Sequence, residues 1–153
     1  MPATLSRAHR RFLVVDEIVG SSIVNFVVNG AIAWVMFHAA RSVPRSSIIA
    51  DTLVTAFVLP LLTSLIVTFA VRVQVARGKL PPLPRDGLDA SAWLERPSAQ
   101  RGALVGAAAV ALVAAPVAIG FALVGPAQLS SHGFLWFKAS FAASLGAVVT
   151  PLI

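Results

Sequence analysis

A few polar side chains interrupt long apolar stretches of this sequence, and their spacing points to the chemistry the chain can do. Asn25 and Asn29 are four residues apart, as are Ser140 and Ser144, so each pair shares one face of a helix. With a helical rise of about 1.5 Å per residue, the two pairs fall at matching depths in antiparallel helices. The sequence therefore predicts one mid-membrane polar cluster, made of Asn25, Asn29, Thr55, Thr63, Ser140 and Ser144.

Such a cluster suits two different roles. Ser, Thr and Asn side chains bind transmembrane helices to one another, and each contact contributes about 0.6–2 kcal/mol. Polar groups inside a membrane also line solute and ion pathways. The sequence alone leaves both interpretations open.

Two prolines lie near the middle of apolar segments, Pro60 in the second and Pro116 in the third. A proline removes one backbone donor and tends to kink its helix. Pro60 leaves the carbonyl of Ala56 without its usual partner, at the depth estimated for Asn29. We therefore expect the Asn29 amide, or a water that it holds, to bind that carbonyl.

Charged residues mark the two rims of the apolar segments. Asp16 and Glu17 precede the first segment, where a negative charge favours the positive end of the helix dipole. They are also placed to pair with Arg72 or Arg101. The functional alternative is a proton or cation acceptor at the cytoplasmic entrance.

At the opposite rim, Asp51 opens the second segment and Lys138 lies about one turn inside the fourth. We expect the long Lys138 side chain to reach the surface. The alternative is an ion pair with Asp51 that lowers the cost of burying the ammonium. His38, Asp51 and His132 are weak candidates for a metal site, because no HxxxH or HExxH spacing supports one.

Composition places these residues in a membrane protein. The 153 residues are 58% hydrophobic and only 12% charged, with a mean hydropathy of +0.86. A bilayer core of about 30 Å needs about 20 apolar residues in a helix. We predict an all-α polytopic protein of one domain, residues 1–153, as a four-transmembrane-helix bundle with short external turns. The predicted helices are approximately 13–39, 48–74, 102–124 and 133–153.

The basic residues predict the orientation. The N-terminal tail holds three of the twelve Lys and Arg residues, and the segment 72–101 holds six more. Because Lys and Arg concentrate on the cytoplasmic side, both termini and the loop 75–101 are predicted to be cytoplasmic. We expect the membrane to be an inner or plasma membrane. Within the loop, residues 88–95 form either a short helix capped by Asp89 or an irregular segment with one buried Trp.

The third segment is rich in small residues. Gly102 and Gly106 have the GxxxG spacing that lets helices approach closely. Packing inside the bundle explains it, and a homodimer is the alternative. The proposed dimer face consists of Gly102, Gly106, Ala114, Ala118 and Ala122. The similarity of residues 58–62 to 149–153 is interpreted as coincidence rather than duplication.

These observations favour a permease- or channel-like protein for a small solute or ion. The alternative is a non-catalytic accessory or scaffold subunit of a larger membrane complex. No Gly-rich phosphate loop or G-x-S-x-G motif is present, so we expect no enzyme and no cofactor. The basic residues flank apolar segments without interleaved aromatics, so the expected surroundings are lipid and not nucleic acid.

Overall fold

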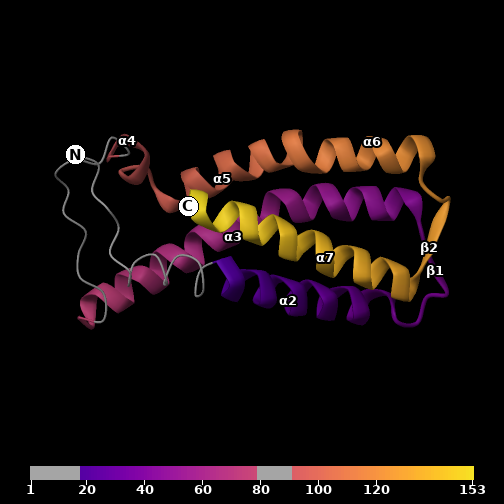
Figure 1. Cartoon of the computed structure of the whole chain (residues 1–153), viewed down its shortest axis with the longest axis horizontal. Helices are drawn as coiled ribbons and strands as arrows, with labels where there is room; N and C mark the ends of the chain where they lie inside the picture. The colour runs from indigo at the N-terminus through magenta and orange to yellow at the C-terminus, as the bar shows by residue number, and fades with distance from the viewer. Residues whose placement is uncertain (1–17, 79–90) are drawn as a thin grey trace.

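The computed structural model describes residues 18–78 and 91–153, and nearly all of them are helical (Figure 1). Four helical segments are long and apolar enough to cross a membrane. The first two are α2 (Gly20–Phe37) and α3 (Arg45–Ala76). The third joins α5 (Ser98–Ala109), the π-helical turn η2 (Val110–Ala114) and α6 (Ala115–Val124). The fourth is α7 (Ser131–Val149), continued by η3 (Thr150–Leu152), and a short helix α4 (Ser91–Leu94) precedes α5.

The last three long segments begin two to four residues earlier than predicted, for local reasons. Pro44 and Pro97 stand directly before α3 and α5 in extended conformation. A proline disfavours the helical conformation in the residue before it, so a helix readily starts just after one. At α7, the Ser130 hydroxyl accepts a hydrogen bond from the Gly133 amide at 3.1 Å and caps the first turn. The predicted start of the first helix, 13–17, lies outside the described residues.

Two three-residue strands, absent from the prediction, join the turns at one end of the molecule. β1 (Ser42–Pro44) pairs antiparallel with β2 (Gln128–Ser130). The Ser42 hydroxyl adds a bond of 2.8 Å to Oε1 of Gln128. We call this the β end, and the opposite end, which holds α4 and Ile153, the loop end (Figure 1).

The four segments form a row rather than a closed bundle. α2 packs on α7, α7 packs on α3, and α3 packs on α5, η2 and α6. Figure 1 shows this order from the indigo α2 at the bottom to the orange α6 at the top. The two middle segments are therefore the most buried, and the two outer ones expose most of their apolar side chains.

The row consists of two related helix–turn–helix units, which we call hairpins although a helix of the other unit separates the two helices of each one. α3 begins at Arg45 and α7 at Ser131, an offset of 86 residues (131 − 45), and β1 and β2 show the same offset (128 − 42). The strand register is unchanged when the two strands are exchanged, as expected about a twofold axis between them. Buried residues of α3 and α7 also match at this offset: Ile48 with Phe134, Ala56 with Ala142, and Leu59 with Leu145. The likeness of 58–62 to 149–153 has a different offset, 91 (149 − 58), so it is out of register with the structural repeat.

The prolines have different effects on their helices. α3 runs without interruption through Pro60, which is buried. Pro116 is the second residue of α6, and the carbonyl deprived of its donor is that of Leu112, inside the π-helical turn η2. The third segment is therefore the irregular one, which distinguishes it from α2.

Candidate functional site

The structure does not gather the six predicted polar residues into one interior cluster. Thr55 is buried and Thr63 half-buried in α3, while Asn25 and Asn29 are half-buried in α2. Ser140 and Ser144 share one face of α7 as predicted, but that face is exposed. The spacing of the two serines predicts that they share a face, but it does not predict the rotation of α7 about its own axis, which turns that face outward.

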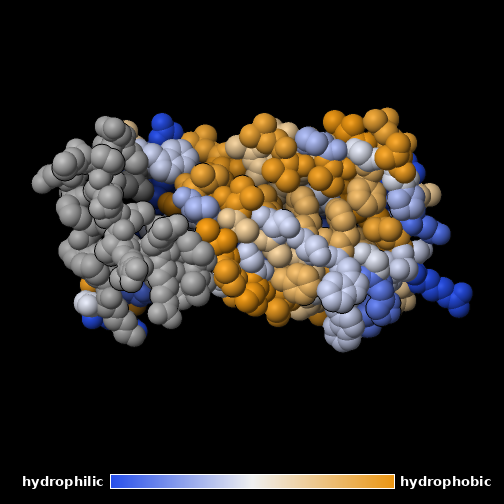
Figure 2. Space-filling view, viewed as in Figure 1, coloured by the Kyte–Doolittle hydropathy of each residue, from blue (hydrophilic) through white to orange (hydrophobic). Residues whose placement is uncertain are grey.

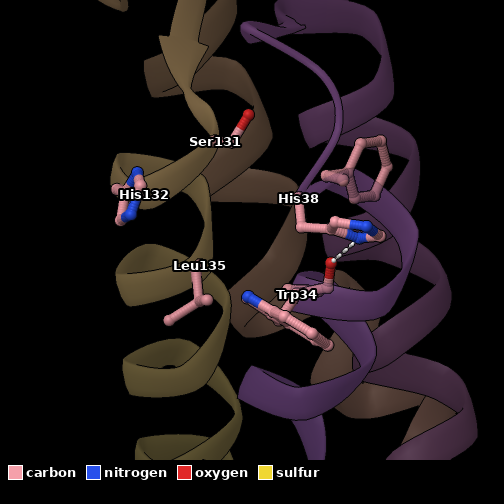
Figure 3. Close-up of a pocket in the computed structure, with 7 residues that line it drawn as sticks. Trp34, His38, Ser131, His132 and Leu135 are labelled. Carbon is pink, nitrogen blue, oxygen red and sulfur yellow. Dashed lines mark hydrogen bonds between the residues drawn. The ribbon is translucent and has the colours of Figure 1, made fainter.

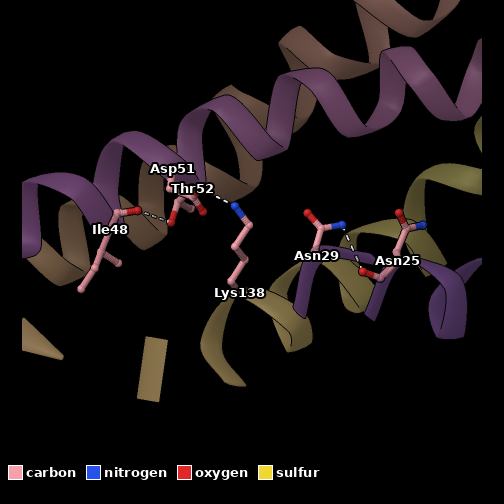
Figure 4. Close-up of polar contacts among 6 residues, drawn as sticks. All are labelled: Asn25, Asn29, Ile48, Asp51, Thr52 and Lys138. Atoms are coloured by element: carbon pink, nitrogen blue, oxygen red, sulfur yellow. Dashed lines mark hydrogen bonds and ion pairs between the residues drawn. The ribbon is translucent and has the colours of Figure 1, made fainter. Parts of the chain in front are cut away.

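The amides of Asn25 and Asn29 are used within their own helix. Nδ2 of Asn29 donates to the Asn25 carbonyl at 3.0 Å, and Nδ2 of Asn25 donates to the Ser21 carbonyl at 2.9 Å (Figure 4). The hydrogen bonds of the described residues include no direct bond from the Asn29 amide to the Ala56 carbonyl, and the water-mediated bond stays a prediction. The Asn25 side chain lies against Gly146 of α7, where an added Cβ would come within 2.5 Å of Nδ2. Gly146 thus makes room for Asn25 where α2 meets α7.

An ion pair connects the two middle helices. The Lys138 ammonium of α7 binds Oδ1 of Asp51 on α3 (Figure 4). Lys138 is 4% exposed, so the expectation that it reaches the surface is wrong and the alternative holds. At the internal offset Lys138 corresponds to the buried Thr52, whose hydroxyl is bound to the Ile48 carbonyl at 2.7 Å. The pair therefore lies where the two hairpins meet, and removing one partner leaves a buried charge uncompensated.

The three weak metal candidates do not come together. His38 and His132 line one pocket of about 70 Å³ at the β end, together with Trp34, Ser131 and Leu135 (Figure 3). Nδ1 of His38 lies 3.0 Å from the Trp34 carbonyl, and its ring stacks on that of Trp34. Asp51 is engaged with Lys138 instead. Within residues 18–78 and 91–153, no group of three or more His, Cys, Asp or Glu side chains is placed to hold a metal ion.

Arg45 has a role at the β end that sequence reasoning missed. Its guanidinium donates to three carbonyls at the end of α6, those of Ala122 and Gly125 at 2.8 Å and Pro126 at 3.2 Å. The last carbonyls of a helix have no partner within the helix, and a cation there satisfies them and favours the helix dipole. Arg45 thus fixes the first hairpin to the second.

Arg101 does similar work at the loop end. It is buried, and it donates to the Ile153 carbonyl at 2.6 Å and to the Thr68 hydroxyl at 3.1 Å. Trp93 of α4 donates to the neighbouring Leu152 carbonyl at 3.1 Å. The predicted partners Asp16 and Glu17, and the predicted cap Asp89, lie outside the described residues.

Gly102 and Gly106 of the third segment pack against another helix of the same chain. A Cβ at Gly102 would come within 2.8 Å of the Leu61 Cα atom, and one at Gly106 within 2.7 Å of the Phe57 carbonyl oxygen. Both glycines therefore face α3, and they are not available to the homodimer face predicted for this segment. Of its other members, Ala114 is buried, Ala118 half-buried and Ala122 exposed.

The outward faces of the middle helices differ at equivalent positions. On one face of α7, from one turn after the exposed Trp136 to the end of the helix, five exposed or half-buried residues form what we call the α7 arc: Ser140, Ala143, Ser144, Ala147 and Val148. Subtracting 86 gives the α3 arc: Val54, Phe57, Val58, Leu61 and Leu62. The α3 arc is bulky and apolar, whereas four of the five residues of the α7 arc are small and two of them carry hydroxyls. Figure 2 shows pale, weakly hydrophilic atoms crossing the apolar surface along the course of α7.

Searches of protein-family models, of curated proteins and of solved structures found no match to this chain. The assignment of function therefore depends on the residues and their geometry.

Proposed function

We propose that this protein is a polytopic membrane subunit without catalytic activity, which assembles with another membrane-embedded chain through the α7 arc. The observation that carries this proposal is the difference between the two arcs. Lipid tails are as apolar as Leu, so a lipid-facing helix gains nothing from small or hydroxyl-bearing side chains. Such side chains do favour contact between helices, because backbones approach closely and hydroxyls find partners.

The proposed orientation places the loop end in the cytoplasm of an inner or plasma membrane. Arg72, Arg77, Arg96 and Arg101 belong to that end, whereas Arg41 and Arg45 belong to the β end. This asymmetry agrees with the concentration of Lys and Arg on the cytoplasmic side of membrane proteins. Both chain termini would then be cytoplasmic.

The exposed residues of the α3 arc and the outer helices would face lipid, while Phe57 and Leu61 of that arc also adjoin the α5 glycines. Leu62 is 50% exposed and Val54 60%, and both lie among other apolar side chains. Large exposed apolar surfaces are unusual for a protein in water and ordinary for one in a bilayer. The two sides of the row would therefore have different neighbours, lipid at the α3 arc and protein at the α7 arc.

Photocrosslinking tests this function. A diazirine-bearing residue is placed at position 140 or 144, and the matched control places it at 54 or 58, which the repeat makes equivalent. In the membranes of cells that naturally make this protein, we expect protein adducts from 140 and 144 and lipid adducts from 54 and 58. Lipid adducts from all four positions would contradict the proposal.

A permease-like function is the second candidate, and the buried ion pair favours it. Ionisable side chains within membrane segments often mark ion or proton routes, and transporters with internal repeats place their sites at the repeat interface. The Asp51–Lys138 pair has both properties. The test is proton flux into proteoliposomes that contain a pH-sensitive dye, comparing the wild type, Asp51→Asn and protein-free vesicles. Flux that appears in the wild type and is lost in the variant supports this candidate, and wild-type flux equal to that of protein-free vesicles excludes a proton route through the ion pair.

A further inference from the structure

We propose that the loop end holds a binding site for a phosphate group at the first turn of α5, built around the buried Arg101. The phosphate belongs either to a lipid headgroup of the leaflet at that end or to a soluble phosphate compound. This inference uses none of the residues of the α7 arc, so it is independent of the proposed assembly.

Arg101 has a nitrogen without a partner. The residue is 7% exposed, and two of its three guanidinium nitrogens donate to the Ile153 carbonyl and the Thr68 hydroxyl. The third nitrogen, Nε, is also buried, and no acceptor for it occurs in the part of the chain that the structure describes. No Asp or Glu carboxylate of that part pairs with the guanidinium either. A buried donor without an acceptor costs about 1–3 kcal/mol, and more when it is charged, so Arg101 favours an added anion.

The first turn of α5 offers a second set of donors. Pro97 precedes the helix without capping it, and the turn contains no acidic residue. The Arg101 amide donates to the Pro97 carbonyl at 3.0 Å. The amides of Ser98, Ala99 and Gln100 come before it and have no acceptor within residues 18–78 and 91–153. Ala99 and Gln100 are exposed, so this turn is open to a ligand. Amides at a helix N-terminus bind anions, with help from the helix dipole.

The Arg101 side chain points towards this turn. A helical side chain lies over the turn that precedes its own Cα atom, which for Arg101 is the first turn of α5. The bonds to α3 agree with this direction. The Ser64 hydroxyl donates to the Ser98 carbonyl at 2.7 Å, and the guanidinium reaches Thr68, one turn of α3 further towards the loop end. The guanidinium therefore lies at the level where α5 begins, as do the three amides.

The surrounding charges favour an anion, and the donors favour a phosphate. Arg96 is exposed two residues before α5, and Arg72 is exposed one turn beyond Thr68 on α3. Among the described residues of the loop end, the one carboxylate is that of the exposed Glu95. A phosphate group has several acceptor oxygens, so it can accept from Arg101 and from the helix amides together. Basic sites at the membrane surface also bind the phosphates of lipid headgroups.

Binding of matched lipids to the full chain in detergent tests this site. Phosphatidic acid carries a phosphate group, and diacylglycerol with the same acyl chains lacks it. Inorganic phosphate is the soluble probe. Native mass spectrometry detects the lipid adducts, and broadening of the phosphorus NMR signal detects bound inorganic phosphate. We expect the wild type to retain phosphatidic acid and not diacylglycerol, and equal retention of the two lipids would overturn the site.

The variant Gln100→Glu separates binding from folding. Gln100 is exposed in the first turn of α5, so a carboxylate there favours the helix dipole while it repels a phosphate. We expect the affinity for phosphatidic acid to fall by about tenfold, with the helical circular dichroism unchanged. Gln74→Glu is the matched control, because it makes the same change about 9 Å beyond Thr68 along α3. Its affinity should equal that of the wild type.

The outcomes distinguish the source of the phosphate. Loss of the phosphatidic acid adduct in Gln100→Glu alone supports a lipid headgroup. Binding of inorganic phosphate that is lost in the same variant, without a lipid adduct in the wild type, supports a soluble compound. Wild-type affinity in Gln100→Glu would overturn the site. Binding of neither probe by the wild type would also overturn it, and this is the result expected if Asp16 or Glu17 pairs with Arg101.

Discussion

The middle helices α3 and α7 have matching inward faces and contrasting outward faces. Inside, Ile48 matches Phe134 and Leu59 matches Leu145, because both sets must fill the core of one row. On the outward faces, Val54 and Val58 of α3 occupy the positions equivalent to Ser140 and Ser144 of α7. The shared inward pattern shows what the fold requires of such a hairpin. The outward difference shows what only one hairpin requires, and we attribute it to a protein partner.

Removing one member of the ion pair that joins α3 and α7 should have the largest effect on the unfolding free energy. Lys138→Met leaves the half-buried Asp51, whose side chain is 19% exposed, as an unpaired charge, which costs up to about 3–5 kcal/mol of unfolding free energy. The measurement is SDS titration of purified protein in mixed micelles. The double variant Asp51→Leu with Lys138→Met should recover most of the loss, because no charge is left unpaired. A single variant as stable as the wild type would contradict the structural role of the pair.

Overpacking the contact between α3 and α5 should have the next largest effect. In Gly106→Ala the added methyl meets the Phe57 carbonyl, so the helices must move apart, at a cost of about 1–3 kcal/mol. Gly120→Ala is the control, since a Cβ there finds no atom within 4 Å and alanine favours a helix. Thermal unfolding in detergent distinguishes the two. If Gly106→Ala were no less stable than Gly120→Ala, α5 would not pack as described.

Loss of the Arg45 cap should cost less. Arg45→Ala leaves the last carbonyls of α6 without their donor, and we expect a loss of about 1 kcal/mol. The exposed Arg41, four residues earlier in the chain, provides the control Arg41→Ala. Hydrogen exchange should become faster around residues 122–127 in the Arg45 variant only. Unchanged exchange there would mean that the cap does not hold the two hairpins together.

The smallest effect on folding is expected at the arcs themselves. Ser140→Val changes an exposed side chain, so the unfolding free energy of the separated chain should change by less than about 0.5 kcal/mol. Association should nevertheless weaken, which separates a role in assembly from one in folding. Urea or SDS unfolding under dilute, monomeric conditions is the measurement. A large loss of stability there would show that Ser140 serves the fold instead.

How much of the fold and of the candidate site can be predicted from the sequence depends on which structural property each sequence pattern reflects. The lengths of the apolar stretches predicted all four long helices, because these lengths depend on composition and not on the fold. The depths of Asn29 and Ser140 could be counted along the chain, but Ser140 faces outward, and no count reports that rotation. The partners of Arg45 are carbonyls more than 75 residues away, a contact that no local pattern encodes. Strands of three residues are too short to show an alternating pattern.

The 86-residue internal repeat could not be recognised from the sequence for a related reason. The structural equivalent of Pro60 is Gly146, not Pro151, so the visible similarity of sequence pointed to the wrong offset. The two hairpins share burial and strand register while sharing few residue types. Only the position of each side chain in the row makes the correspondence apparent.

The central claim is that protein covers the α7 arc while lipid covers the α3 arc. Spin labels at Ser140→Cys and Val54→Cys in bilayers test it most directly, through their collision rates with oxygen, which concentrates among lipid tails. We predict clearly lower oxygen accessibility at position 140 than at position 54, although both are exposed in the single chain. Equal accessibility at the two positions would contradict the account.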